Sequence, residues 1–95
     1  VSIYHLTIHN RSDRTVTLLA RKWIVVDASG NRTVIEGDKI VGKTPRLSPG
    51  ESFSYNSFHL TAGDATADGS FHGVDEEGAR VHVRIPRFPM RVPKG

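Results

Sequence analysis

Apolar and polar residues alternate along several short stretches of this 95-residue sequence, and this alternation constrains the fold more than any other feature. A period of two is typical of a β-strand with one buried face. The clearest example is the run R-V-H-V-R-I at residues 80–85. No stretch of useful length shows the i, i+3, i+4 spacing of an amphipathic helix. The sequence therefore predicts an all-β protein.

Six stretches are predicted to be strands, because alternation or β-branched residues dominate them and turn residues bound them. They are Ile3–His9, Thr15–Asp27, Thr33–Glu36, Ser52–His59, Ser70–Val74 and Arg80–Ile85. The second should contain a bulge or break near Ala20–Lys22, where its apolar phase shifts. Its continuously apolar part, Trp23–Val26, is expected to be a central strand buried on both faces. Thr61–Asp68 lacks large apolar residues and is expected to be a loop, and Pro86 is expected to end the last strand.

Six or seven short strands at this spacing predict one antiparallel β-sandwich or barrel. A chain of this length supports a single modest core, and the sequence shows no repeat or linker. Residues 89–95 include two prolines among basic and apolar residues, so we expect an extended basic tail there.

Composition excludes several classes of protein. There is no cysteine, which excludes disulfides, thiolate zinc sites and a cysteine nucleophile, and which fits the cytoplasm. No apolar run approaches the roughly 18 residues of a membrane-spanning helix, so we predict no membrane contact. No signal-peptide pattern is present, but the chain begins with Val1, which leaves open an upstream segment beyond this sequence.

Residues 37–44, G-D-K-I-V-G-K-T, match the phosphate-loop pattern G-x-x-x-x-G-K-[ST]. Such a loop holds phosphates with backbone N–H groups and a helix N-terminus. Pro49 and Gly50 fall within the second turn of any helix that would follow Thr44, which argues against that helix. We therefore predict that the chain stays extended or irregular after Thr44. The alternative is a pyrophosphate or nucleotide site, or a weak hydrolase, built from Gly37, Lys39, Gly42, Lys43 and Thr44.

Four blocks of residues resemble those of the ApaG domain. They are Y-x-L-x-I-x-N at 4–10, L-L-A-R-K-W-I-V-V-D-x-x-G at 18–30, V-G-x-x-P-x-L-x-P-G-x-x-F-x-Y-x-S at 41–57 and I-P-x-F at 85–88. The resemblance spans nearly the whole chain. It implies a fibronectin type III-like fold, so we expect an antiparallel immunoglobulin or fibronectin type III-like sandwich of about seven short strands. Residues 1–88 would form this single domain.

The resemblance also carries expectations about function. It implies a small cytoplasmic bacterial protein associated genetically with cobalt and magnesium efflux. It further implies a module that serves protein contacts in eukaryotic F-box proteins and in a DNA-polymerase-interacting protein. The family has no established catalytic residues, so none is carried over. Family members commonly show G-x-G-x-x-G at 37–42, where Lys39 here replaces the middle glycine, and they carry an upstream strand and a longer segment between residues 69 and 75.

Basic residues near the end of the chain form the best candidate interaction surface. The net charge is +3, and residues 80–95 contain five Lys or Arg and no acid. The candidate surface consists of Arg80, His82, Arg84, Arg87 and Arg91. The alternative is a charged edge strand that prevents edge-to-edge pairing. The chain has only seven Phe, Trp and Tyr residues, which argues against single-stranded nucleic acid as the ligand.

Histidines and acids provide weaker candidates. His5, His9 and His82 would all face away from the core. Ligands at i and i+4 of one strand lie about 13 Å apart and cannot share an ion, so we predict no metal site and no cofactor. The acidic run at 75–77 is interpreted as an exposed turn before Gly78.

These observations favour a non-catalytic protein-interaction or regulatory module over an enzyme. The expected partner is an unidentified protein, with weak anion binding and homodimer formation left open.

Overall fold

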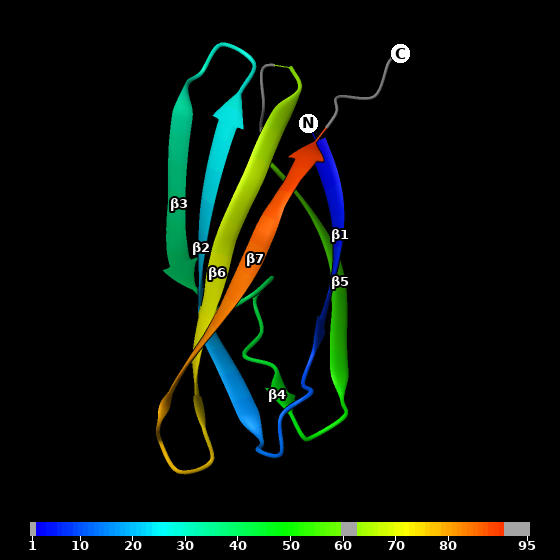
Figure 1. Cartoon of the computed structure of the whole chain (residues 1–95), viewed down its shortest axis with the longest axis vertical. Coiled ribbons are helices and arrows are strands. Elements are labelled where there is room, and N and C mark those ends of the chain that lie inside the picture. Colours follow the sequence, from blue (N-terminus) through cyan, green and yellow to red (C-terminus); the bar gives the residue numbers. More distant parts are fainter. Residues whose placement is uncertain (1, 60–62, 91–95) are drawn as a thin grey trace.

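The computed structural model describes residues 2–59 and 63–90. It contains seven strands: β1 (Ser2–His9), β2 (Val16–Asp27), β3 (Arg32–Asp38), β4 (Arg46–Leu47), β5 (Ser52–His59), β6 (Ala65–Asp75) and β7 (Arg80–Met90). One sheet pairs β1 with β5, and the other has the order β3-β2-β6-β7, with β4 paired to the start of β2. All pairings are antiparallel (Figure 1). The predicted sandwich is confirmed, and no helix occurs in the described ranges.

The core lies between the two sheets and is rich in aromatic rings. Trp23, Phe71, Leu18 and Ile40 have the largest fully buried side chains. The ring of Trp23 lies 5.0 Å from that of Tyr4 and 6.5 Å from that of Phe71, measured between centroids. Because Tyr4 comes from β1 whereas Trp23 comes from β2, the contact between these two rings joins the sheets.

Strand β2 is the central strand that the sequence predicted, and it is bulged. Its register with β6 shifts between Leu18 and Ala20, so Leu19 is the extra residue. The bulge explains the change of apolar phase and lies one residue before the predicted break. The prediction that Trp23–Val26 is buried on both faces is wrong. Ile24 and Val26 are only half-buried, because no third layer covers the outer face.

Strands β6 and β7 are longer than predicted. The expected loop at 61–68 is partly wrong, because β6 begins at Ala65, whose small side chain is buried; residues 61 and 62 lie outside the described ranges. Pro86 does not end β7, because it sits with Arg87 in a bulge where these two residues oppose Asp68. A bulge on an edge strand tolerates a proline, which cannot donate to the ladder. Consequently Pro89 and Met90 of the predicted tail belong to β7.

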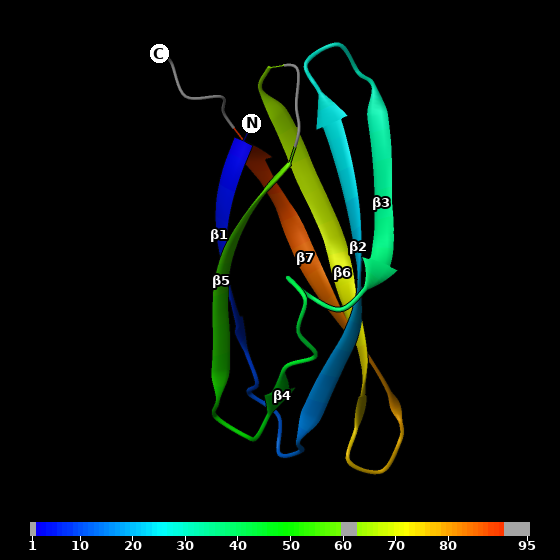
Figure 2. The same ribbon diagram turned by 180° about the vertical axis from the view of Figure 1, so that it is seen from behind.

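The connection from β3 to β5 confirms that no helix follows Thr44. It runs between the two sheets (Figure 2) and contains the short strand β4, which the sequence did not reveal. Ile40 and Lys43 exchange two backbone hydrogen bonds of 2.8 and 3.0 Å around Val41 and Gly42. Both central residues have positive φ, 44° and 77°, as in a type I′ turn.

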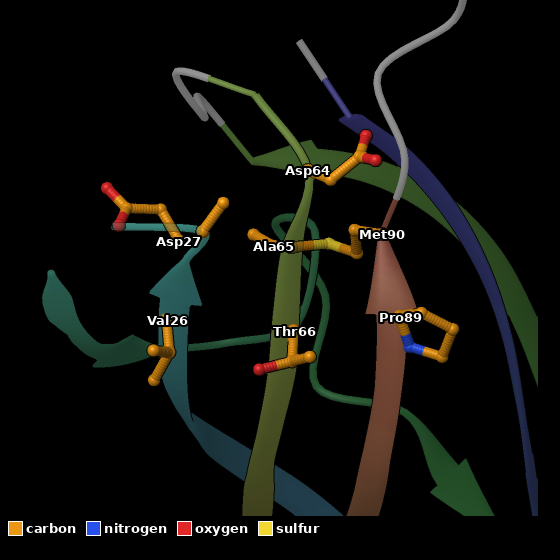
Figure 3. A pocket seen from close by; sticks show the side chains of 8 residues that line it. Val26, Asp27, Asp64, Ala65, Thr66, Pro89 and Met90 are labelled. Atoms are coloured by element: carbon orange, nitrogen blue, oxygen red, sulfur yellow. The ribbon is translucent and has the colours of Figure 1, made fainter. Parts of the chain in front are cut away.

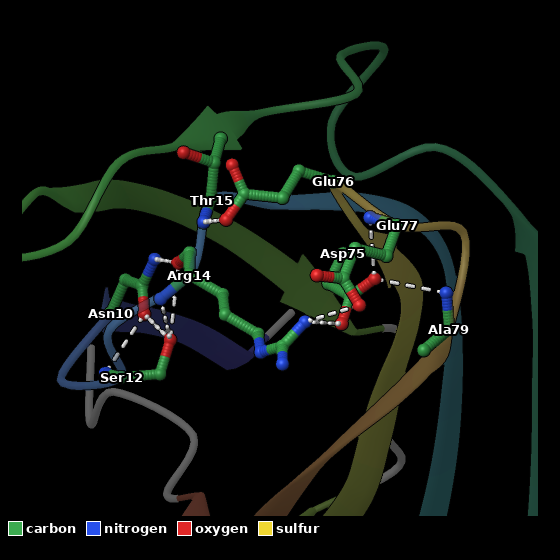
Figure 4. Close-up of polar contacts among 8 residues, drawn as sticks. All are labelled: Asn10, Ser12, Arg14, Thr15, Asp75, Glu76, Glu77 and Ala79. Carbon is green, nitrogen blue, oxygen red and sulfur yellow. Dashed lines mark hydrogen bonds and ion pairs between the residues drawn. The ribbon is translucent and has the colours of Figure 1, made fainter.

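Buried Asn10 ties together the end of the sandwich where the β1–β2 turn meets the β6–β7 turn. Its Nδ2 donates to the carbonyl oxygens of Arg14 at 2.7 Å and Leu47 at 2.8 Å. Arg14 in turn pairs with Asp75 at 3.4 Å and Glu77 at 2.9 Å (Figure 4). The acidic run at 75–77 thus leads into a turn, as the sequence indicated. Its contact with Arg14 was not indicated by the sequence.

Candidate functional site

Three of the predicted basic residues lie together on the outer face of the larger sheet. Arg80, His82 and Arg84 alternate along β7, and all three are exposed. Among the described ion pairs, none includes Arg80 or Arg84. Their charges are therefore available to a partner.

The strand register adds two residues that the sequence analysis missed. His72 of β6 lies opposite His82, with ring centroids 4.9 Å apart. In the next row, Ser70 lies between Arg84 of β7 and Lys22 of β2. Because neighbouring strands lie about 4.8 Å apart, these side chains form one surface. We call Lys22, His72, Arg80, His82 and Arg84 the outer basic cluster.

A shallow hollow of about 400 Å³ adjoins this cluster. Its apolar lining comes mainly from Leu19, Val74 and Val81, and its polar lining from His72, Arg80 and His82. Leu19 is 41% exposed because the bulge in β2 turns it outward. A neighbouring hollow of about 500 Å³ extends over Ala20 towards Glu36. The small side chain of Ala20, shared by both hollows, leaves this part of the sheet concave.

The predicted residue Arg87 is not part of this cluster. It belongs to the β7 bulge, and its Nε lies 3.4 Å from the carboxylate of Asp68. Arg91 lies outside the described residues.

The five residues predicted as an anion loop lie in and after β3. Lys39, Gly42, Lys43 and Thr44 are exposed, and Gly37 is half-buried. The guanidinium of Arg21 holds this loop by donating from Nη1 to the carbonyl oxygens of Asp38 at 2.6 Å and Lys39 at 3.0 Å. No pattern in the sequence indicates this contact, because Arg21 is distant in the chain and becomes a neighbour of the loop only through strand pairing.

Several amides of that loop are already occupied. The N–H of Lys39 donates to the carbonyl oxygen of Leu19 at 2.7 Å, and the N–H groups of Ile40 and Lys43 donate within the turn. A phosphate loop needs free amides and a helix N-terminus. This loop offers neither at these positions.

The predicted histidines do not gather. His5 and His9 lie on β1 of the small sheet, whereas His82 lies on the outer face of the larger sheet. Nε2 of His72 is 2.8 Å from the hydroxyl of Ser70, next to His82. No group of three His, Asp or Glu residues suited to a metal ion occurs within residues 2–59 and 63–90.

Another hollow, of about 300 Å³, lies where β2 and β7 end and β6 begins (Figure 3). Its lining includes Val26, Ala65, Met90 and the carboxylate of Asp27. That carboxylate accepts hydrogen bonds from the N–H groups of Ser29 and Asn31, both 2.9 Å, and these bonds lower the pKa of Asp27. Asp27 therefore shapes the β2–β3 turn.

Membrane contact through a helix has no structural basis in the described ranges. They contain no helix of the length and apolar character needed to cross a bilayer.

Comparisons with known proteins agree on one family. The family model described as the ApaG domain matches residues 1–75. A protein of Vibrio cholerae named Protein ApaG is 37% identical over 94 residues, covering 98% of this chain and 75% of the relative. A Brucella abortus protein of the same name is 38% identical over 92 residues, covering 96% of this chain and 71% of the relative. The crystal structure of a Bordetella pertussis protein described as putative ApaA superposes with a TM-score of 0.88 at 31% identity, covering 98% and 76% of the two chains.

Proposed function

This chain belongs to the ApaG domain family, and we propose that it acts as a non-catalytic module that binds an acidic segment of a protein partner through the outer basic cluster. The observation that carries the proposal is the convergence of Arg80 and Arg84, which form no described ion pair, with His72, His82 and Lys22 on one face of the larger sheet. Lys22 is paired with Glu36 at 3.5 Å, so the two arginines supply the unpaired charge. Surfaces of one charge sign steer and select partners of the opposite sign.

The hollow beside the cluster supports a protein rather than a simple anion as the ligand. Leu19, Val74 and Val81 offer apolar surface next to Arg80 and His82. Protein–protein interfaces combine an apolar centre with a polar rim. The hollow and the charged side chains beside it have this arrangement on a small scale. An acidic segment that also carries an aliphatic side chain would use both parts of the surface.

Nucleic acid fits this face less well. Single-stranded nucleic acids bind where exposed aromatic rings stack on bases. In this structure Trp23, Tyr4, Tyr55 and Phe71 are buried in the core. Phe58 is 57% exposed but belongs to β5 of the other sheet.

A regulatory role gives the proposal a cellular setting. We propose that the chain acts in the cytoplasm. It contains no cysteine and therefore does not rely on disulfides, which are rare in that compartment. The association with cobalt and magnesium efflux suggests the pathway in which a partner would be sought. A deletion strain complemented with the wild-type chain or with a cluster variant, grown in cobalt, would test that setting.

A pull-down from the source cell with charge-reversed variants tests the binding surface. The variant Arg80→Glu/Arg84→Glu should lose the partner that the wild-type chain retains. The matched control Arg11→Glu/Lys43→Glu changes two exposed basic residues, one in the β1–β2 turn and one in the connection after β3, and should retain it. Nuclease treatment distinguishes a protein partner from nucleic acid as the bound ligand. Loss of the bound material on nuclease treatment, or equal retention by both double variants, would overturn the proposal.

A further inference from the structure

Strand β5 presents an unprotected edge. It pairs with β1 on one side, and no other described residue forms a backbone hydrogen bond with Ser52–His59. Its sequence, S-F-S-Y-N-S-F-H, contains no Lys, Arg, Asp, Glu, Pro or Gly. Exposed edges of this kind pair readily with another strand.

The two edges of the larger sheet are protected, in contrast to β5. Strand β3 carries Arg32, Glu36 and Asp38 along a seven-residue stretch. Strand β7 carries three arginines, two prolines and a bulge. Charges, prolines and bulges are the devices by which proteins prevent edge-to-edge pairing. Strand β1 also lacks charged residues, proline and glycine. Strand β5 in addition lines two hollows, which mark its edge as a place where pairing is tolerated.

Two hollows lie beside β5 on the side that faces β2 and β3. The first, of about 240 Å³, is lined by Tyr55, Ser57 and the loop at 38–42. The second, of about 360 Å³, is lined by Ser57 and His59 of β5 and by Trp23 and Ile35 opposite. Tyr4, Arg21 and Ser57 line both, so the hollows are adjacent. We call the two together the β5 groove.

The spacing of the hollows matches the period of a strand. One lies beside Tyr55 and Ser57, and the other beside Ser57 and His59, an offset of two residues along β5. Side chains on one face of an added strand also recur every two residues, about 6.7 Å. A strand paired with β5 would place one side chain in each hollow.

We propose that the β5 edge binds an extended segment of a protein partner as an added strand, with two side chains spaced i and i+2 in the β5 groove. Main-chain hydrogen bonds would supply affinity, and the two hollows would select apolar side chains. This surface is separate from the outer basic cluster, so the inference does not depend on the function proposed above.

A second copy of the chain is the less suitable occupant. Each copy carries a net charge of +3, so edge-to-edge pairing would bring two positive molecules together. Arg21 and Lys39 line the groove together with Asp38, so its lining carries a net positive charge and favours a segment that is neutral or acidic. The proposal therefore commits to a neutral or acidic segment from another protein.

Selection from a displayed library of random peptides tests this inference. The library presents peptides of the length of β5, 8 residues, to the whole chain, with counter-selection against the variant Ser57→Lys. Ser57 is half-buried in the groove, and an inward-pointing charge is one of the devices that prevent edge-to-edge pairing. We expect enriched peptides to carry apolar residues two positions apart. No enrichment over the variant would overturn the proposal.

A synthetic enriched peptide then locates the site by NMR. Its titration should shift the backbone amides of residues 52–59, and N-methylation of alternate peptide residues should weaken binding by about tenfold or more. His5→Lys adds the same charge on exposed β1, one strand away from the free edge of β5, and should leave binding unchanged. The proposal fails if the N-methylated peptide binds equally well, or if the shifts fall only on the outer basic cluster. It also fails if sedimentation shows a dimer that Ser57→Lys abolishes, since a second copy would then occupy the edge.

Discussion

The guanidinium of Arg21 lies against the backbone of Gly37. A Cβ placed on Gly37 would be 3.0 Å from Nη1 of Arg21. The same Nη1 donates to the carbonyl oxygens of Asp38 and Lys39. Gly37 thus gives room to an arginine that fixes the course of the loop, which accounts for this glycine without any phosphate.

Two glycines of the larger sheet, Gly69 and Gly37, differ in the atoms that surround them. Alanine substitutions at these positions should therefore differ in their cost in free energy of unfolding. A Cβ on Gly69 would lie 2.0 Å from the carbonyl oxygen of Lys22, which belongs to a paired backbone. We expect Gly69→Ala to lower the free energy of unfolding by about 2–3 kcal/mol or more. Gly37→Ala should cost less than about 1 kcal/mol, because a guanidinium can move aside. Urea unfolding measures both, and equal costs would contradict the contacts described.

Replacing Val41 in the turn at Val41 and Gly42 should stabilise the protein. Val41 has φ 44° and is 44% exposed, and a β-branched side chain disfavours that conformation. Asparagine is favoured there, so Val41→Asn should raise the free energy of unfolding by about 0.5–1 kcal/mol. A calorimetric scan would show a higher melting temperature. Val34→Asn makes the same exchange on exposed β3, where it should lower the melting temperature; a rise in both variants would refute this explanation.

Asn10 should contribute much more to the free energy of unfolding than the neighbouring ion pairs of Arg14. Asn10→Ala removes the donors to the carbonyl oxygens of Arg14 and Leu47 and leaves Leu47 without that partner in a buried place. We expect a loss of about 2–3 kcal/mol in the free energy of unfolding. Arg14→Ala breaks ion pairs with Asp75 and Glu77 that are screened by solvent, so it should cost much less than Asn10→Ala. Denaturant titration compares them, and the reverse order would show that the ion pairs dominate.

Stability should fall on mild acidification because of His59. Burial lowers the pKa of this imidazole, and its Nε2 has no hydrogen-bond partner among the described residues. Below about pH 6.5 the unfolded chain binds a proton at this histidine that the folded chain resists. The free energy of unfolding therefore decreases as pH falls from about 6.5 towards the lowered pKa. His59→Phe should make the slope between pH 7 and pH 5 shallower, and an unchanged slope would show that other groups cause it.

Nucleotides should not bind the loop at 37–44. The amides of Lys39, Ile40 and Lys43 are used within the protein, and no helix follows Thr44. Calorimetric titration with ATP, GTP and pyrophosphate should give no heat of binding at micromolar concentrations. Micromolar binding that Lys43→Ala abolishes would establish the anion site instead.

The strands and their inward faces were largely predictable because alternation is a local property. Tyr4, Ile8, Tyr55 and Ile85 are buried as their period of two indicated. The predicted end at Pro86 failed because its tolerance depends on a bulge opposite Asp68, which no local pattern reveals. Ile40 is fully buried although it lies in a connection, since only the meeting of the two sheets covers it.

The candidate surfaces were predictable only in part. Arg80, His82 and Arg84 share a face because they alternate on one strand, and the sequence contains that information. Their neighbours His72 and Lys22 depend on register, which is set by pairing across strands and by the two bulges. The groove beside β5 was not predicted, because it forms between segments of different sheets.

The sequence by itself determined that this chain is all-β, that it belongs with ApaG domains and that no helix follows Thr44. These features rest on periodicity, on proline and glycine, and on residue blocks along one stretch of chain. The tertiary structure alone decided which charges gather, which edge stays unprotected and which loop Arg21 holds. Those features require contacts between residues far apart in sequence, and such contacts exist only once strand pairing has closed the intervening chain.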